Sequence, residues 1–231
     1  MKKTSRLSLF VLLFFSVFIK VKAQQIIAKQ DFGVWVGVAL KKELPSNFEI
    51  SLEQQLRTCL NTTRIDNYWA ELGLTYTINK NFRLNSNARY IHDVNKWKAA
   101  ENSLRYNLDI EFRAKVKKKF QLFYRLRYQQ KFINLLQRQR TPIAQRRSAV
   151  RNKIRGSFQY KKVHKFYFST ELFVTSEVFR EAYLDKLRFC IGDKIKTNVG
   201  SFNCAVGYEV NVQVNDPFSF FFLKIVYSIK L

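Results

Sequence analysis

The chain has 231 residues and a formal net charge of +24 at pH 7, with 41 Lys and Arg against 17 Asp and Glu. This length fits one ordinary domain and is too short for two large ones. The three cysteines, Cys59, Cys190 and Cys204, are odd in number and widely spaced, so they predict neither a disulfide framework nor a CxxC metal site.

The first segment has the features of a secretory signal peptide. A basic start precedes an apolar run from Leu7 to Ile19, and Val21-Lys22-Ala23 offers small residues at the positions that a signal peptidase reads. The apolar run is short for a membrane span, although a retained anchor is the alternative. We expect residues 1–23 to be cleaved and residues 24–231 to form a single domain.

The basic character belongs to the part of the chain that folds. Cleavage removes five basic residues and no acid, so about +19 of the +24 remains. In a cytosolic protein this charge points first to nucleic acid, but export argues against that partner. We expect outer-membrane lipid headgroups, lipopolysaccharide phosphates or small anions instead.

Alternation with a period of two dominates the chain after Ala23, and no later segment is apolar for long enough to be a transmembrane helix. In the clearest run one face carries only apolar and aromatic residues and the other only polar ones. The first set is Leu104, Tyr106, Leu108, Ile110 and Phe112; the second is Arg105, Asn107, Asp109, Glu111 and Arg113. About eleven such runs occur, each near the roughly 9–11 residues that a tilted strand needs to cross a membrane.

Short connections alternate with longer ones, which is the layout of outer-membrane barrels with periplasmic short turns. We therefore predict an all-β fold: a closed antiparallel up-and-down transmembrane β-barrel of 10–12 strands. Single-chain bacterial barrels normally have an even strand number. The count of eleven therefore predicts a miscounted strand at a terminus, most readily around Gln24 to Gln30.

Periodicity alone does not say which face points inward, but composition favours the polar one. That face mixes charges with Trp35, Trp69 and Phe123, which suits a crowded lumen. The apolar face carries tyrosines near strand ends, as in the aromatic girdles of membrane barrels. These are Tyr68, Tyr76, Tyr90, Tyr106, Tyr128 and Tyr160.

The same strand phases direct Cys190 and Cys204 to opposite faces, so we expect free cysteines.

Five predicted hairpins bring an acid opposite an arginine on the polar face. The pairs are Asp31–Arg57, Glu71–Arg89, Asp109–Arg127, Glu111–Arg125, Glu171–Arg155 and Glu209–Arg188. Opposed charges support strand pairing, so one interpretation is that these residues mutually hold the interior. A basic excess remains on one strand, from Arg147 through Arg151 and Lys153 to Arg155, and it allows a second interpretation, an anion-favouring path. A wide pore is not expected, because side chains fill a barrel of this strand number.

The predicted connections are also basic. Many lysines gather at the short turns. We expect them to form a solvated rim that also contacts anionic phospholipid headgroups. They are Lys41, Lys42, Lys80, Lys115, Lys117, Lys118, Lys119, Lys161, Lys162, Lys165, Lys194 and Lys196. Arg138, Arg140, Arg146 and Arg147 flank the longest loop, which is either an ordinary exposed loop or a site for lipopolysaccharide phosphates.

The sequence predicts no catalytic, cofactor or metal site. The only histidines are His92 and His164, and neither a HExxH motif nor a phosphate-binding glycine loop is present. One constellation remains as an alternative: His92, followed by Asp93, faces Asn102 and Ser103 across a predicted hairpin, as a hydrolase triad would require.

A family resemblance rests on the order and spacing of several strand motifs. They are DFGVW, SLEQQLR, LGLTYTINKNFRLNSNARY, RYNLDIEFRAK, YRLRYQ and VRNKIR. In these the chain resembles domain-of-unknown-function family 2490, from about Asp31 to the C-terminus. The resemblance implies an exported protein of Gram-negative bacteria and an outer-membrane barrel, and it brings no substrate or catalytic residues. The chain departs from barrel proteins in general at its end, which is Leu231 rather than the aromatic residue that the barrel-assembly machinery reads.

We therefore expect a non-enzymatic protein of the bacterial outer membrane, either structural or a narrow anion-favouring pathway with a salt-bridged lumen. Its partners would be lipid, lipopolysaccharide, the assembly machinery and possible small anions. The alternatives are an outer-membrane hydrolase that uses the His92 region and a secreted soluble barrel that binds a ligand within an apolar interior.

Overall fold

The computed structural model describes residues 29–94, 100–133, 146–177, 181–212 and 218–231. The expected signal peptide, residues 1–23, lies outside these ranges. The described residues form eleven strands: β1 (Lys29–Leu44), β2 (Phe48–Cys59), β3 (Arg64–Thr77), β4 (Phe82–Asp93), β5 (Glu101–Lys115), β6 (Phe120–Ile133), β7 (Arg146–Tyr160), β8 (His164–Glu177), β9 (Tyr183–Lys196), β10 (Gly200–Asn211) and β11 (Phe218–Lys230). No helix among them is long and apolar enough to cross a membrane.

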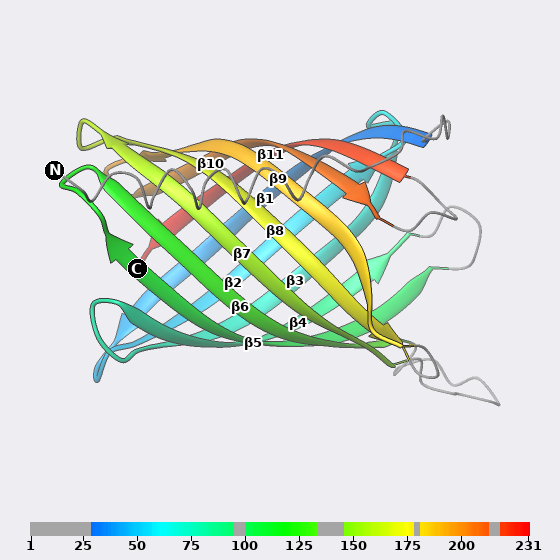
Figure 1. Ribbon diagram of the computed structural model, residues 1–231, viewed down its shortest axis with the longest axis horizontal. Coiled ribbons are helices and arrows are strands. Elements are labelled where there is room, and N and C mark those ends of the chain that lie inside the picture. Colours follow the sequence, from blue (N-terminus) through cyan, green and yellow to red (C-terminus); the bar gives the residue numbers. More distant parts are fainter. Residues whose placement is uncertain (1–28, 95–99, 134–145, 178–180, 213–217) are drawn as a thin grey trace, which may run out of the picture.

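The strands close into one barrel, in which each strand pairs antiparallel with its neighbour in sequence. Its axis runs horizontally in Figure 1, with the short turns at the left, hereafter the short-turn end, and the longer connections at the right, the long-loop end. The closing pair is β1 with β11, and it is parallel over thirteen positions, from Lys29 opposite Phe218 to Lys41 opposite Lys230. The predicted all-β closed barrel is thus confirmed.

An odd strand number explains the parallel closure. When strands alternate in direction, the first and the eleventh run the same way, and both β1 and β11 run from the long-loop end to the short-turn end (Figure 1). The expectation of an even number with a miscounted strand is therefore wrong for the described residues. Lys29 and Gln30 already belong to β1, the ring closes without a further strand, and residues 24–28 lie outside the described ranges.

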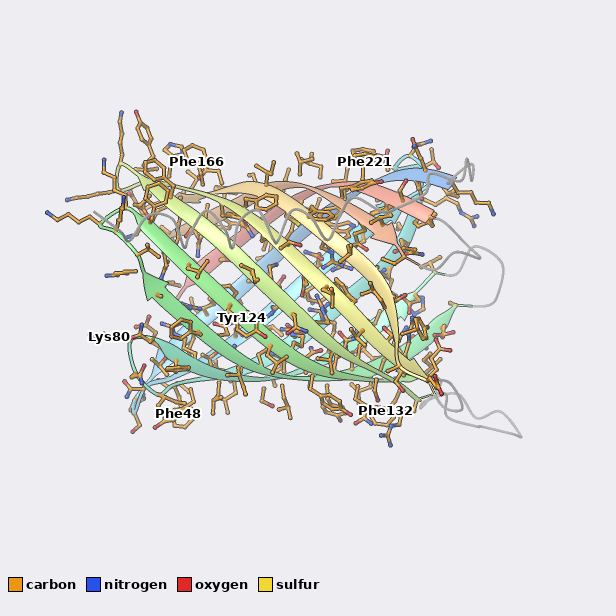
Figure 2. All side chains as sticks on the ribbon, viewed as in Figure 1. Phe48, Lys80, Tyr124, Phe132, Phe166 and Phe221 are labelled. Carbon is orange, nitrogen blue, oxygen red and sulfur yellow. The ribbon has the colours of Figure 1, made fainter. Side chains whose placement is uncertain are left out.

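The two faces of the sheet are sorted by polarity, with the apolar side chains outside. Leu108, Ile110 and Leu126 point outward, and Leu108 is 58% exposed. Figure 2 shows side chains projecting all around the outer surface. Its labelled aromatic rings lie toward both ends, Phe48 and Phe166 toward the short-turn end and Phe132 and Phe221 toward the long-loop end. The inward positions of the same strands carry the charges, so an apolar interior, which the soluble-barrel alternative requires, is not the one observed.

Glycines make room for the aromatic rings that fill the interior near the closing pair. Phe222 is 1% exposed and stacks on Trp35 with ring centroids 3.7 Å apart. A Cβ on Gly207, which lies opposite Phe222 on β10, would approach that ring to 2.1 Å. The ring cannot move aside easily because Trp35 covers it. Gly156 differs, since a Cβ there would meet nothing within 4 Å.

We predict that Gly207→Leu lowers the free energy of unfolding by about 1–3 kcal/mol, the usual cost of overpacking. Gly156→Leu is the matched control and should have little effect, because its side chain enters open space on the outer face. Denaturant unfolding in detergent micelles measures both. Equal stability of the two variants would contradict the packing described here, and Phe222→Ala should restore part of the loss in Gly207→Leu.

Candidate functional site

The charged interior is the candidate site, and strand register decides which charges meet there. Four of the predicted oppositions are confirmed: Glu71 with Arg89, Asp109 with Arg127, Glu111 with Arg125, and Glu209 with Arg188. Three of these pairs bond directly. Arg127 donates two hydrogen bonds of 2.6 Å to Asp109, a bidentate geometry that is stronger than a single contact. Arg89 donates to Glu71 at 2.7 Å, and Arg188 donates to Glu209.

The fourth opposition does not produce an ion pair. Glu111 and Arg125 lie opposite each other, but Glu111 accepts from Arg113 at 2.7 Å and Arg125 reaches Glu171 at 2.7 Å. Arg125 thus reaches past Lys153, its neighbour on β7, and binds a carboxylate on β8, two strands away. Register therefore predicts neighbours better than it predicts bonds.

The predicted opposition of Asp31 and Arg57 is wrong. In the turn after β1, Ser46 and Asn47 are in the left-handed region, with φ of 60° and 65°. This turn sets the register of β1 and β2, in which Arg57 lies opposite Trp35. Asp31 lies near the turn at the other end, where its carboxylate accepts from the backbone amides of Leu60 and Asn61 at 3.0 and 2.9 Å.

The predicted opposition of Glu171 and Arg155 is also wrong, by two residues along the strand. The three-residue turn after β7, with Lys161 at φ 51°, places Glu171 opposite Lys153 and Arg155 opposite Ser169. Arg155 instead stacks over the ring of Tyr167, with its guanidinium carbon 4.6 Å from the ring centroid.

Glu171 is nevertheless the most connected acid of the described interior. It is 1% exposed, and four cations surround its carboxylate: Arg125 at 2.7 Å, Arg151 at 2.8 Å, Arg188 at 3.5 Å and Lys153 at 3.7 Å. Arg188 continues to Glu209, which also accepts from Lys186 at 3.1 Å. We call Glu171 and its four cations the Glu171 cluster.

Aromatic rings lie against several of the inward guanidinium groups, including some that also bind a carboxylate. Arg57 lies 4.0 Å from the ring centroid of Trp35, and Arg89 lies 3.5 Å from that of Trp69. Arg151 stacks on Phe173 at 4.3 Å. Such cation–π contacts are strongest where water is excluded. The rings therefore add to the ion pairs of Arg89 and Arg151 and stabilise Arg57, which forms no ion pair with a described residue.

A cavity of about 370 Å³ lies in this interior, hereafter the chamber. Its lining extends from Lys153 and Lys224 at mid-barrel to Lys131 and Asp185 near the long-loop end. Twelve basic side chains line it against four acids, which are Glu53, Glu71, Glu171 and Asp185. The volume is at the lower end of the range for small-molecule pockets, so the chamber has room for a small solute and not for a wide water column.

One cross-strand row in the chamber concentrates the basic excess. Arg89 lies opposite Arg105, Arg105 opposite Lys131, and Lys131 opposite Arg147, on four consecutive strands from β4 to β7. We call these four residues the cationic row. Acids extend it at both ends, since Arg89 pairs with Glu71 and Arg147 lies opposite Glu177. Like charges directly opposed destabilise a sheet, so the middle of the row is electrostatically unfavourable.

A second cavity, of about 850 Å³, lies at the short-turn end, hereafter the lysine cavity. Seven lysines line it, and none of the residues of its lining is an acid. The lysines are Lys41, Lys161, Lys162, Lys165, Lys194, Lys196 and Lys230. Lys41 and Lys230 reach Glu49 and Glu43 nearby. Both ends of the interior are therefore basic.

The structure does not bring together the histidine and serine of the hydrolase alternative. His92 is on the outer face, where its Nδ1 lies 2.7 Å from Asn102 Oδ1, whereas Ser103 is buried on the inner face opposite Ile91. His164 pairs with Asp193 at 2.6 Å. Within the described ranges no three His, Cys, Asp or Glu side chains lie together as metal ligands.

Two further predictions concern the cysteines and the arginines that flank the longest loop. Cys59, Cys190 and Cys204 form no disulfide, as expected. Arg146 is exposed at the long-loop end, and Arg147 bonds Asp185 at 3.2 Å. Arg138 and Arg140 lie outside the described residues.

Several residues of the interior were not predicted from the sequence. Arg105 was predicted to lie on the polar face, but no acid was predicted opposite it. Its position between two cations depends on the β4–β5 register, which cannot be predicted across a long connection. Phe173 and Phe222 are apolar residues at inward positions. Glycines lie opposite Phe222 on both neighbouring strands, Gly33 and Gly207, and are a weak sequence signal for its ring; Phe173 lies between Arg151 and Lys186 and has no such signal.

The comparisons with known proteins identify a family and nothing more specific. The family model described as "Protein of unknown function (DUF2490)" matches residues 32–218, which spans the barrel from β1 to the first residue of β11. The comparison with curated proteins found no match.

We predict that Glu171→Gln destabilises the barrel by about 3–5 kcal/mol, because it leaves buried cations without their counter-charge. Glu43→Gln is the matched control, since Glu43 and Lys230 form an exposed pair at 3.0 Å that water already screens. Tryptophan fluorescence during denaturant unfolding in detergent compares the two. A loss of stability that is equal in both variants would mean that the Glu171 cluster does not hold the interior.

Proposed function

The chain belongs to the family of proteins of unknown function DUF2490, and we propose that it is an integral β-barrel of the bacterial outer membrane whose basic interior admits small anions. The observation that carries this proposal is the polarity of the sheet, apolar outside and charged inside.

The outer surface is too apolar for water. Large hydrophobic side chains are exposed on every strand, and Ile191 and Val206 are 67% and 60% exposed. Monomeric soluble proteins rarely expose contiguous apolar patches above a few hundred Å². Each such side chain would gain about 1.5–3 kcal/mol on full burial in an apolar medium, and hydrocarbon supplies that medium around the whole barrel.

Strand length and the aromatic residues fit a bilayer. The strands have 12 to 16 residues, more than the ~9–11 that a tilted strand needs to cross the hydrocarbon. The exposed tyrosines Tyr76 and Tyr160 are toward the short-turn end, and Tyr68 and Tyr90 toward the long-loop end. Amphipathic rings favour headgroup level, so these positions agree with two interfacial girdles.

The two ends suggest an orientation. Short turns are periplasmic in outer-membrane barrels, so the lysine cavity would face the periplasm and its phospholipid headgroups. Arg146, at the opposite end, would be near lipopolysaccharide phosphates. The expected signal peptide over residues 1–23 supports export, and the barrel-assembly machinery would then be a partner during insertion.

The interior favours anions because its basic residues outnumber its acids at both ends. A lumen lined by arginines and lysines lowers the energy of an anion and raises that of a cation. The chamber is small, and Asn107, Glu171 and Phe222 fill the barrel at mid-height. We therefore propose a narrow passage for small anions and not a general porin.

We predict that the full-length chain, expressed in a Gram-negative host, fractionates with outer membranes and migrates faster on a gel when unheated than when boiled. A closed barrel resists detergent at room temperature, and heating opens it. Recovery as a monodisperse protein in detergent-free buffer would contradict the membrane assignment.

We also predict that the purified protein in planar bilayers gives a small conductance with a reversal potential of anion sign. Lys224→Gln, which removes a chamber lysine, should shift that potential toward zero, whereas Lys118→Gln at an exposed turn should not. A cation-selective current would refute the anion preference, and the absence of any current would refute the passage while leaving the membrane assignment intact.

A further inference from the structure

Arg105 is the one member of the cationic row without a carboxylate partner among the described residues. Arg89 donates to Glu71, Lys131 donates to Asp93 at 2.9 Å, and Arg147 reaches Asp185 at 3.2 Å. Arg105 lies directly between Arg89 and Lys131 in the sheet. It therefore has a positive charge on each side and no carboxylate bonded to it among the described residues.

The nearby acids do not relieve this repulsion, because each already binds another group. Asp93 attracts Arg105, but its carboxylate is bonded to Lys131, which also lies 3.8 Å from Glu101. Glu71 accepts from both Arg89 and Asn107. The Nε of Arg105 is buried without an acceptor in the described part of the chain.

Arg57 provides a second cation that faces the same chamber. Its Nε donates to Gln55 at 2.8 Å, its guanidinium plane rests on Trp35, and no described carboxylate lies within ion-pair distance. The charge of Arg57 acts on Arg105. A stacked guanidinium keeps its in-plane N–H groups available, so two sets of donors are directed at one small space.

The indole of Trp69 adds a further imbalance between donors and acceptors. Trp69 is 4% exposed and lines the chamber, and its Nε1–H has no acceptor among the described residues. Buried donors without acceptors are rare in folded proteins because each costs free energy. This part of the interior thus has too many donors and too much positive charge for its own acceptors.

We propose that the chamber binds a small oxyanion, a phosphate or a carboxylate group, at Arg105, with Arg57 as the second ligand. Guanidinium groups bind both kinds of oxyanion through paired N–H donors, and an anion at Arg105 removes the repulsion within the cationic row. The inference rests on the proposed anion-favouring interior and gives that interior a specific site.

Equilibrium binding tests the site separately from membrane location and passage. The full-length protein in detergent is titrated calorimetrically with inorganic phosphate and, in a second arm, with acetate. We expect saturable binding of at least one of them, and the stronger arm identifies the preferred oxyanion. Arg105→Gln and Arg57→Gln should each weaken that binding about tenfold or more, as the loss of charged hydrogen bonds implies.

Arg155→Gln is the matched control. Arg155 is also an inward arginine without a carboxylate partner among the described residues, but it does not line the chamber. Its replacement should leave the dissociation constant unchanged. If binding is not saturable in either arm, or if Arg155→Gln weakens it as much as Arg105→Gln does, the attraction is diffuse and the proposal is wrong.

Stability separates a ligand-binding arginine from a merely structural one. Without phosphate or acetate, Arg105→Gln should unfold at the same temperature as the wild type or higher, because it removes like-charge repulsion. With the anion, the wild type should gain thermal stability and Arg105→Gln should not. An intrinsic loss of stability in Arg105→Gln, with the anion-dependent gain retained, would overturn the proposal. If Arg105→Gln fails to fold, Arg105→Lys is measured in its place. It keeps the positive charge and should bind the anion with an affinity between those of the wild type and a variant without the charge.

Discussion

In a closed β-barrel every second side chain must enter one small space, and here many of those side chains are charged. An unpaired charge in a confined interior is costly, so the fold depends on how the inward charges compensate one another. Glu171, almost fully buried among four cations, is the centre of that compensation. Aromatic rings add to that compensation: Trp35 stacks with Arg57, which has no ion pair among the described residues, and Phe173 stacks with Arg151 of the Glu171 cluster.

The odd strand number links closure of the ring to the composition of the interior. Eleven alternating strands force β1 and β11 to be parallel, and stacked aromatic rings occupy part of the inward side of this closing pair. Phe222 packs there against Trp35 in space that Gly207 leaves open. The basic excess lies around the chamber, and its clearest concentration is the cationic row on β4 to β7.

Strand identity, face polarity and most hairpin registers follow from the sequence, because alternation is local and tight turns transmit it. The pairs Asp109–Arg127 and Glu71–Arg89 could be predicted for this reason. Asp31 and Glu171 were assigned wrong partners because the register depends on turn residues with positive φ, such as Ser46 and Lys161, and a shift of one position moves every pair. The parallel closure joins residues far apart in the chain, and Arg105 faces Arg89 across a long connection, so neither was visible in local pattern.

The central claim is that the apolar face contacts hydrocarbon. It is tested most directly by nitroxide labels at Leu72, Leu108 and Ile191, which are outward on three separate strands and more than half exposed, in protein reconstituted into lipid bilayers. Labels in hydrocarbon collide more often with dissolved oxygen than with a water-soluble nickel chelate, and the account predicts this for all three positions, with the reverse for a label at Lys118. Preferential collision of the three labels with the chelate would contradict it.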